Sequence, residues 1–150
     1  MDILFINGSP NKNGNTVALA NELLKGREYE TLNLVDYKIY SYGQEFADDQ
    51  FGEIVVKMKE AKTIVIGSPV YWHSMSGAIR TLLDRFYGPV QQGALKGRML
   101  FFLFQGAAPT KKMLEFGEYT MSRFAGLYGM TYLGMATNST EAGKLSETLK

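Results

Sequence analysis

Residues 3–16 read ILFINGSPNKNGNT, and this stretch decides how the rest of the chain is interpreted. The apolar run ILFI passes directly into nine small or polar residues, 8–16, among which there is no acidic side chain. Continuous apolar runs of this kind, repeated later as TIVIG and MLFFLF, are typical of strands buried on both faces of a parallel sheet. The stretch therefore predicts a buried strand that is followed by a long polar loop.

Apolar runs alternate with amphipathic segments along the whole chain. The apolar runs predict strands at residues 3–7, 30–34, 63–68, 99–105 and 131–137. Helical periodicity predicts helices at residues 15–25, 49–60, 77–87, 110–128 and 139–149. This alternation predicts an α/β three-layer sandwich with a five-stranded parallel sheet of order 2-1-3-4-5, which is the flavodoxin-like order. In that order the first and third strands are neighbours, so we expect a ligand at the loops that begin at Gly8 and Ser68.

The composition narrows the possible functions. With 150 residues and 45% hydrophobic content, the chain is expected to fold as one domain over residues 1–150. A net charge of +1, from 16 basic and 15 acidic residues, provides no electrostatic basis for binding nucleic acid or an anionic membrane. The first apolar run is too short for a signal peptide or a membrane span, and we expect a cytoplasmic protein.

Two residue types decide which redox chemistry is open to the chain. The absence of cysteine excludes disulfides, thiolate zinc sites and iron–sulfur ligation. His73 is the only histidine, and a lone histidine is no metal site, so no metal ion is expected. Any redox reaction must then depend on a bound organic cofactor.

The loop at residues 8–16 is predicted to bind a phosphate group. It lies between a buried strand and a helix start, where free backbone N–H groups and the helix dipole favour an anion. A turn with a helix cap at Asn15 or Thr16 explains only some of these residues. The dinucleotide fingerprint is absent, and the P-loop pattern fails because Gly8 and Gly14 are one residue too far apart and Asn15 replaces the required lysine.

Two segments together resemble a known family. GSPNKNGNT at residues 8–16 and SPVYWHSMSGAIRTLLDRFYG at residues 68–88 are similar to the flavodoxin-like NAD(P)H-dependent FMN reductases, a resemblance that covers roughly residues 1–137. It implies that the first loop wraps the FMN phosphate with Ser9, Asn11, Gly14, Asn15 and Thr16. It implies that the isoalloxazine is lined by Pro69, Val70, Tyr71 and Trp72, and that its pyrimidine side is closed by Gln105, Gly106 and Ala107.

The resemblance implies an FMN-dependent oxidoreductase that takes a hydride from NADH or NADPH. Its acceptor would be a small molecule such as a quinone, a free flavin, a metal ion, or a nitro or azo compound. No catalytic side chain is then required, because the flavin N5 carries out the hydride transfer. An alternative is a flavodoxin-type FMN electron carrier without a substrate of its own, and a flavin-binding regulatory module is a third. Flavodoxin-type carriers are typically strongly acidic proteins that dock basic partners. The net charge of +1 of this chain therefore favours the reductase.

The resemblance also implies a homodimer. The segment after the second strand and the helix at residues 77–87 are rich in aromatic residues, which are favoured in interface cores: Tyr40, Tyr42, Phe46, Phe86 and Tyr87. Some relatives carry a cysteine cluster after the second strand that holds an iron–sulfur centre. This chain has IYSYGQEF there, so the iron–sulfur version is excluded.

Overall fold

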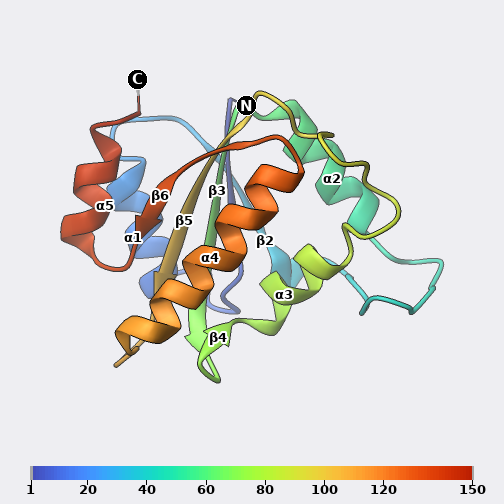
Figure 1. Cartoon of the computed structure of the whole chain (residues 1–150), viewed down its shortest axis with the longest axis horizontal. Coiled ribbons are helices and arrows are strands. Elements are labelled where there is room, and N and C mark those ends of the chain that lie inside the picture. The colour runs from blue at the N-terminus through green and yellow to red at the C-terminus, as the bar shows by residue number, and fades with distance from the viewer. Residues whose placement is uncertain (1, 150) are drawn as a thin grey trace.

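Five parallel strands form the middle layer of the chain in a computed structural model, which describes residues 2–149 (Figure 1). The strands are β1 (Ile3–Asn7), β2 (Glu30–Asn33), β3 (Thr63–Tyr71), β5 (Met99–Gln105) and β6 (Thr131–Ala136). They lie in the order β2-β1-β3-β5-β6, and every pair of neighbours is parallel. The predicted three-layer α/β sandwich and its strand order are confirmed.

Helices cover both faces of the sheet (Figure 1). One face is covered by α1 (Asn15–Leu23) and α5 (Ser139–Ser146), and the other by α2 (Phe51–Glu60), α3 (Gly77–Asp84) and α4 (Lys111–Leu127). A short 3-10 turn, η1 (Leu34–Asp36), follows β2. Four helices end one to three residues earlier than the sequence predicts, whereas α2 ends at Glu60 as predicted.

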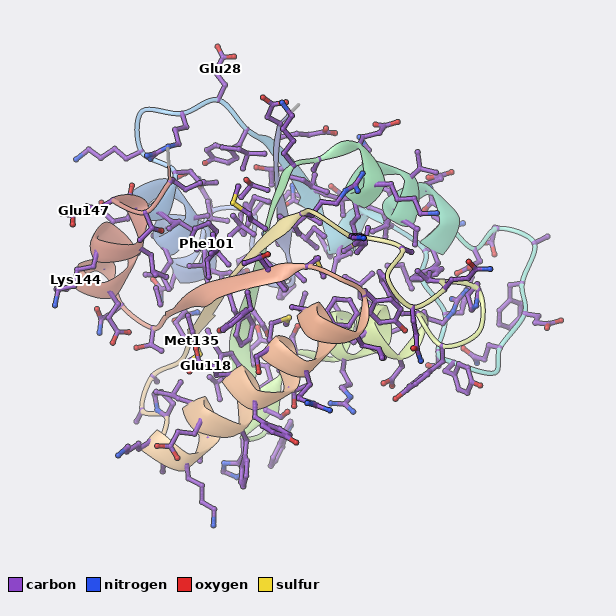
Figure 2. The ribbon with its side chains drawn as sticks, turned by 45° about the horizontal axis from the view of Figure 1, so that its top comes forward. Glu28, Phe101, Glu118, Met135, Lys144 and Glu147 are labelled. Atoms are coloured by element: carbon purple, nitrogen blue, oxygen red, sulfur yellow. The ribbon has the colours of Figure 1, made fainter. Side chains whose placement is uncertain are left out.

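The sheet separates two hydrophobic clusters because successive strand residues face opposite sides. Phe101, which is fully buried in β5, belongs to the cluster beneath α1 and α5, whereas its neighbour Phe102 belongs to the cluster beneath the other three helices. Figure 2 shows Phe101 inside the molecule, while Glu28, Lys144 and Glu147 point outward. Burial on both faces explains why these strands read as continuous apolar runs.

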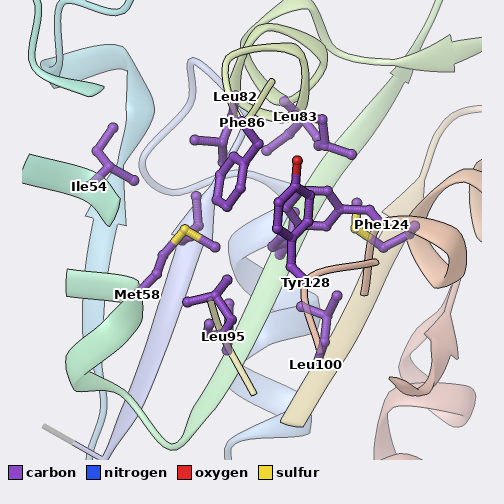
Figure 3. Packing of buried hydrophobic residues seen from close by; sticks show 14 of the residues in the cluster. Ile54, Met58, Leu82, Leu83, Phe86, Leu95, Leu100, Phe124 and Tyr128 are labelled. Atoms are coloured by element: carbon purple, nitrogen blue, oxygen red, sulfur yellow. The ribbon is translucent and has the colours of Figure 1, made fainter. Parts of the chain in front are cut away.

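Phe86 lies at the centre of the larger cluster and is fully buried (Figure 3). Its ring centroid lies 4.9 Å from that of Phe124 and 4.9 Å from that of Tyr128, both in edge-to-face geometry. Such pairs stabilise a core beyond the area they bury. The inclusion of Phe86 among the expected interface aromatics is therefore wrong, because the ring anchors the end of α3 to α4.

The third strand is longer than predicted and ends in a hairpin. β3 continues from Ser68 to Tyr71, and a short strand, β4 (Ser74–Met75), pairs with its end in antiparallel orientation. Pairing of Tyr71 with Ser74 leaves a two-residue connection. The sequence does not reveal this hairpin, because β4 is too short to show periodicity and the connection lacks the Asn-Gly signal that usually marks such a turn.

Arg85, directly after α3, ties the long segment at residues 37–50 to the rest of the protein. Arg85 Nη1 donates to Tyr40 O at 2.9 Å and to Asp49 Oδ1 at 2.9 Å, and Nη2 donates to Asp49 Oδ2 at 2.6 Å. These hydrogen bonds lower the pKa of Asp49, and the guanidinium lies 4.9 Å from the ring centroid of Phe51. A bidentate ion pair thus ties this segment to the end of α3.

Two glycines let the helices approach the sheet at the carboxyl ends of its strands. Gly8 N donates to Gly67 O at 2.8 Å, which joins the first loop to β3. A Cβ added at Gly8 would lie 2.3 Å from Ile79 Cγ1, and one added at Gly67 would lie 2.6 Å from Thr16 Cγ2 and 2.9 Å from Phe5 Cε1. All three distances are shorter than van der Waals contact, so a side chain at either glycine would displace α1 or α3.

We expect Gly67→Ala to destabilise the protein by about 1–3 kcal/mol, because the added methyl group overpacks the contact with Thr16 and Phe5. Gly52→Ala is the matched control, since Gly52 is exposed in α2 and a Cβ there meets nothing within 4 Å. The control should stabilise the helix by up to about 1 kcal/mol. Urea unfolding followed by circular dichroism measures both, and equal stabilities of the two variants would contradict this account of the packing.

Candidate functional site

Three loops meet at one edge of the sheet. They follow β1, β3 and β5, which are neighbours in the sheet and run in the same direction. Because the carboxyl ends of parallel strands lie together, residues 8–14, 72–73 and 106–110 are close in space. This is the edge at which the sequence predicts a ligand.

Asn7, at the end of β1, organises the first loop. It is fully buried, its Nδ2 donates to Asn33 Oδ1 at 3.0 Å and to Asn11 O at 3.2 Å, and its Oδ1 accepts from Ser9 N at 3.1 Å. Ser9 is also buried, and its Oγ accepts from Asn11 N at 3.1 Å. The sequence analysis missed Asn7, although its register opposite Asn33 on β2 pairs two amides that can bond across the strands.

The N-terminus of α1 opens toward this loop without a side-chain cap. Gly14 occupies the cap position in an extended conformation, no side-chain cap bond is formed there, and the first turn contains no acidic residue. Asn15 is exposed, whereas Thr16 is buried and its Oγ1 accepts from Gln105 Nε2 at 3.3 Å. The helix start therefore offers backbone N–H groups and a positive dipole end to an anion. Lys12 pairs with Asp36 at 2.7 Å in an exposed position beside the loop.

Two buried serines join the first loop to α3. Ser76 Oγ donates to Gly8 O at 2.8 Å and accepts from Ile79 N at 3.4 Å, so one hydroxyl both holds the loop and caps α3. Ser76 N in turn donates to Ser68 Oγ at 2.9 Å. Both serines lie within the motif at residues 68–88, but no role was predicted for their side chains. The position of Ser76 just before an amphipathic helix is the signal that could have identified the cap.

The predicted ring-contacting residues lie on the hairpin and not on a free loop. Pro69, Val70 and Tyr71 belong to β3, and Trp72 begins the turn. Pro69 is buried and Val70 half-buried, while Tyr71 is 43% exposed and Trp72 is 94% exposed. The expectation that these residues form an irregular loop is wrong, because antiparallel pairing with β4 extends the strand.

The third loop follows Gln105, the last residue of β5, and its first residue, Gly106, contacts the hairpin. A Cβ added at Gly106 would lie 3.0 Å from Val70 Cβ, so the two loops are in close contact there. Ala107 follows in an exposed position. Gln105 reaches back to the start of α1 through its bond to Thr16, which connects the first and third loops as well.

Two hollows flank the hairpin. One, of about 180 Å³, is lined by Gly8, Ser9, Pro10, Val35, Tyr71, Ser76, Gly77 and Ala78. The other, of about 330 Å³, is lined by Val70, Trp72, His73, Gly106, Ala107, Ala108, Pro109 and Met113. We call the second hollow the hairpin cleft.

Within residues 2–149 no cluster of potential metal ligands occurs, and none of the described helices is long and apolar enough to span a bilayer.

Comparison with known proteins matches this arrangement to a family. A family profile described as NADPH-dependent FMN reductase matches residues 1–142. The chain belongs to the NADPH-dependent FMN reductase family. The resemblance predicted from residues 8–16 and 68–88 is thereby confirmed.

Individual relatives agree with the family assignment. An iron–sulfur flavoprotein of Archaeoglobus fulgidus is 37% identical over 97 residues, which cover 57% of this chain and 48% of the relative. The chain thus spans about half the length of such relatives. Among solved structures, a Trp repressor binding protein of Bacillus subtilis has a TM-score of 0.78 at 18% identity, with 99% of each chain covered. A flavone reductase has a TM-score of 0.79 at 19% identity, with 99% of this chain and 62% of that chain covered. The two structural similarities establish the fold.

Proposed function

We propose that residues 1–150 form one FMN-binding domain of an oxidoreductase that takes a hydride from NADPH or NADH and reduces a small acceptor. The observation that carries this proposal is the uncapped N-terminus of α1, which the hydrogen bond between Thr16 and Gln105 joins to the loop after β5 at the same edge of the sheet. It provides a site for a phosphate group next to a site for a flat ring. Family membership supports FMN as the compound that has both.

The first loop fits a phosphate dianion. Gly14 leaves the helix start open, Asn15 presents a neutral side chain to solvent, and no acid lies in the first turn to repel the charge. We assign phosphate binding to the backbone and side chains of Asn11, Gly14, Asn15 and Thr16. Ser9 stabilises the conformation of the loop, because its buried hydroxyl accepts a hydrogen bond from Asn11 N.

The second and third loops fit the isoalloxazine ring. Pro69, Val70 and Tyr71 provide a rigid strand edge, while Gly106 and Ala107 leave the opposite wall without bulky side chains. Gln105 is held at the boundary between phosphate and ring by its bond to Thr16. When bound, FMN supplies the atom that accepts the hydride, so the chain needs to contribute only orientation, exclusion of water and hydrogen-bond donors.

The acceptor is proposed to be a small electrophile such as a quinone, a free flavin, a metal ion, or a nitro or azo compound. The alternative is an FMN carrier that is reduced only by a protein partner. The net charge of +1 supports the reductase, because docking to a basic partner would be favoured by a strongly acidic surface. A cytoplasmic location follows from the same proposal, since NAD(P)H is a cytosolic reductant.

The proposed function predicts that NADPH or NADH bleaches the flavin absorbance of the FMN-loaded protein within seconds. Anaerobic stopped-flow absorbance with each nucleotide separately measures the rate and establishes which donor is preferred. Dithionite is the control, because it reduces any bound flavin. A protein that dithionite bleaches but that neither nucleotide bleaches within minutes would be the carrier.

Removal of the phosphate contacts should distinguish FMN from riboflavin. In Asn15→Ala/Thr16→Ala we expect the dissociation constant for FMN to rise at least about 10-fold, because a helix-terminal anion site loses two charge-assisted donors. Riboflavin has no phosphate, so its dissociation constant should change less than about 3-fold. Titration of the apoprotein followed by flavin fluorescence measures both. Equal losses for the two ligands would assign these residues to the fold alone.

We also propose that two copies associate through the groove between α3 and α4. This groove, of about 340 Å³, has an apolar floor that includes Leu83, Phe124 and Leu127, and Tyr87 and Tyr119 on its rim are 62% and 64% exposed. It carries charges of both signs: Arg80 pairs with Asp84 at 3.4 Å, and Arg123 makes no ion pair within residues 2–149. A surface with exposed aromatics and both charges is self-complementary, as a two-fold dimer requires.

The dimer proposal predicts twice the chain mass by light scattering at micromolar concentration, and a monomer for Tyr119→Asp/Arg123→Glu. The two substitutions place uncompensated negative charge in an apolar groove, which opposes burial of that surface. Lys25→Glu is the control, because Lys25 is exposed beyond the end of α1, on the opposite face of the sheet. A monomeric parent protein with FMN bound would contradict the proposal.

A further inference from the structure

The turn η1 lies along the first loop and is joined to it near both of its ends. Asn33, directly before η1, accepts a hydrogen bond from Asn7 Nδ2 at 3.0 Å. Asp36, the last residue of η1, lies with its Oδ1 2.7 Å from Lys12 Nζ. Because Asn7 is fully buried, the first of these contacts fixes the turn, and the carboxylate of Asp36 is held beside the loop.

Lys12 is the only charged residue within residues 8–16, and it lies close to the start of α1. The chain turns tightly there, since a Cβ added at Gly14, the cap residue of α1, would lie 3.1 Å from Asn11 Cβ. The pair with Asp36 directs the ammonium toward the segment that follows β2, and β2 lies on the side of β1 away from β3. The positive charge of the loop is therefore held on the β2 side of the site.

This ion pair leaves the first loop without net charge. The groups that remain for an anion are the backbone N–H groups at the start of α1 and neutral side chains. A carboxylate beside such a site also repels an anion, and a second negative charge on the ligand doubles the repulsion. The side chains of Lys12 and Asp36 are 55% and 50% exposed, so the pair contributes little to the stability of the fold. Either charge can therefore be removed without unfolding the protein.

We propose that Asp36 is a specificity-determining residue that weakens the binding of a phosphate-bearing flavin, because it neutralises Lys12 and repels the phosphate dianion. The inference rests on the proposed function, which places the FMN phosphate at the start of α1. Asp36 acts on the phosphate alone, since the isoalloxazine ring of oxidised FMN is uncharged. The ion pair thereby keeps FMN exchangeable, whereas an unpaired lysine at this position would hold the phosphate more tightly.

Three variants test this assignment through the charge that each leaves beside the phosphate. In Asp36→Asn we expect the dissociation constant for FMN to fall about 3–10-fold, because Lys12 is released and the repulsion is lost. In Lys12→Ala it should rise about 3–10-fold, because the carboxylate is left uncompensated. The double variant should lie within about 2-fold of the parent protein, since the net charge beside the phosphate is unchanged. Titration of the apoprotein in about 0.1 M salt, followed by flavin fluorescence, measures all three.

Controls separate the charge from other effects of the substitutions. Riboflavin lacks the phosphate, so its dissociation constant should change less than about 2-fold in every variant. Asp2→Asn removes the same charge at the other edge of the sheet, where Asp2 forms an exposed pair with Lys62 at 3.7 Å. The length of β1 separates that pair from the first loop by roughly 16 Å, more than the Debye length of about 10 Å at 0.1 M salt, so FMN affinity should not change. In 1 M NaCl the effect of Asp36→Asn should shrink to less than about 2-fold.

Three results would overturn the assignment. An unchanged or higher dissociation constant for FMN in Asp36→Asn would show that Asp36 does not oppose phosphate binding. Equal changes for FMN and riboflavin would show that the pair acts through the shape of the loop. A double variant that binds FMN as weakly as Lys12→Ala would show that Lys12 alone matters. By contrast, variants that bind FMN as expected, in a protein that neither NADPH nor NADH reduces, would contradict the proposed function and leave the role of Asp36 intact.

Discussion

The contact between Gly8 and Gly67 is the constraint on which the site depends. The hydrogen bond from Gly8 N to Gly67 O, at 2.8 Å, brings the first loop against β3, and it forms where neither residue has a Cβ to separate the backbones. The same two positions admit Ile79 from α3 and Thr16 from α1. Backbone contact therefore brings the first loop, the end of β3 and the starts of α1 and α3 together.

Side-chain hydrogen bonds then give these loops one shape. Asn7 and Ser76 are buried polar residues whose donors and acceptors are used inside the protein, so they stabilise the shape of the loops. A buried polar group that lost its partner would cost free energy, which makes each such network specific for a single arrangement. The backbone N–H groups at the start of α1 and the exposed tip of the hairpin lie outside this network.

Arg85 ties the long segment at residues 37–50 to the helices beside it. It bonds Asp49 and the carbonyl of Tyr40, and its guanidinium lies over the ring of Phe51, the first residue of α2. A partly buried guanidinium is an effective anchor because its planar donors constrain two partners at once. The chain has no cysteine, so no disulfide contributes to this anchoring.

Much of the architecture was determined by the sequence alone. Doubly buried strands and amphipathic helices have periods that can be read directly, so the parallel sheet, its order and the two carboxyl-end loops were predicted correctly. The family was also predictable, because it depends on two local motifs. The tertiary structure decided the features that depend on residues far apart in the sequence. These are the burial of Phe86, the hydrogen bonds of Asn7, the two hydrogen bonds of the Ser76 hydroxyl, and the hairpin at Trp72 and His73. A strand of two residues has no period, and a hydroxyl or amide can bond many groups until folding brings one within reach.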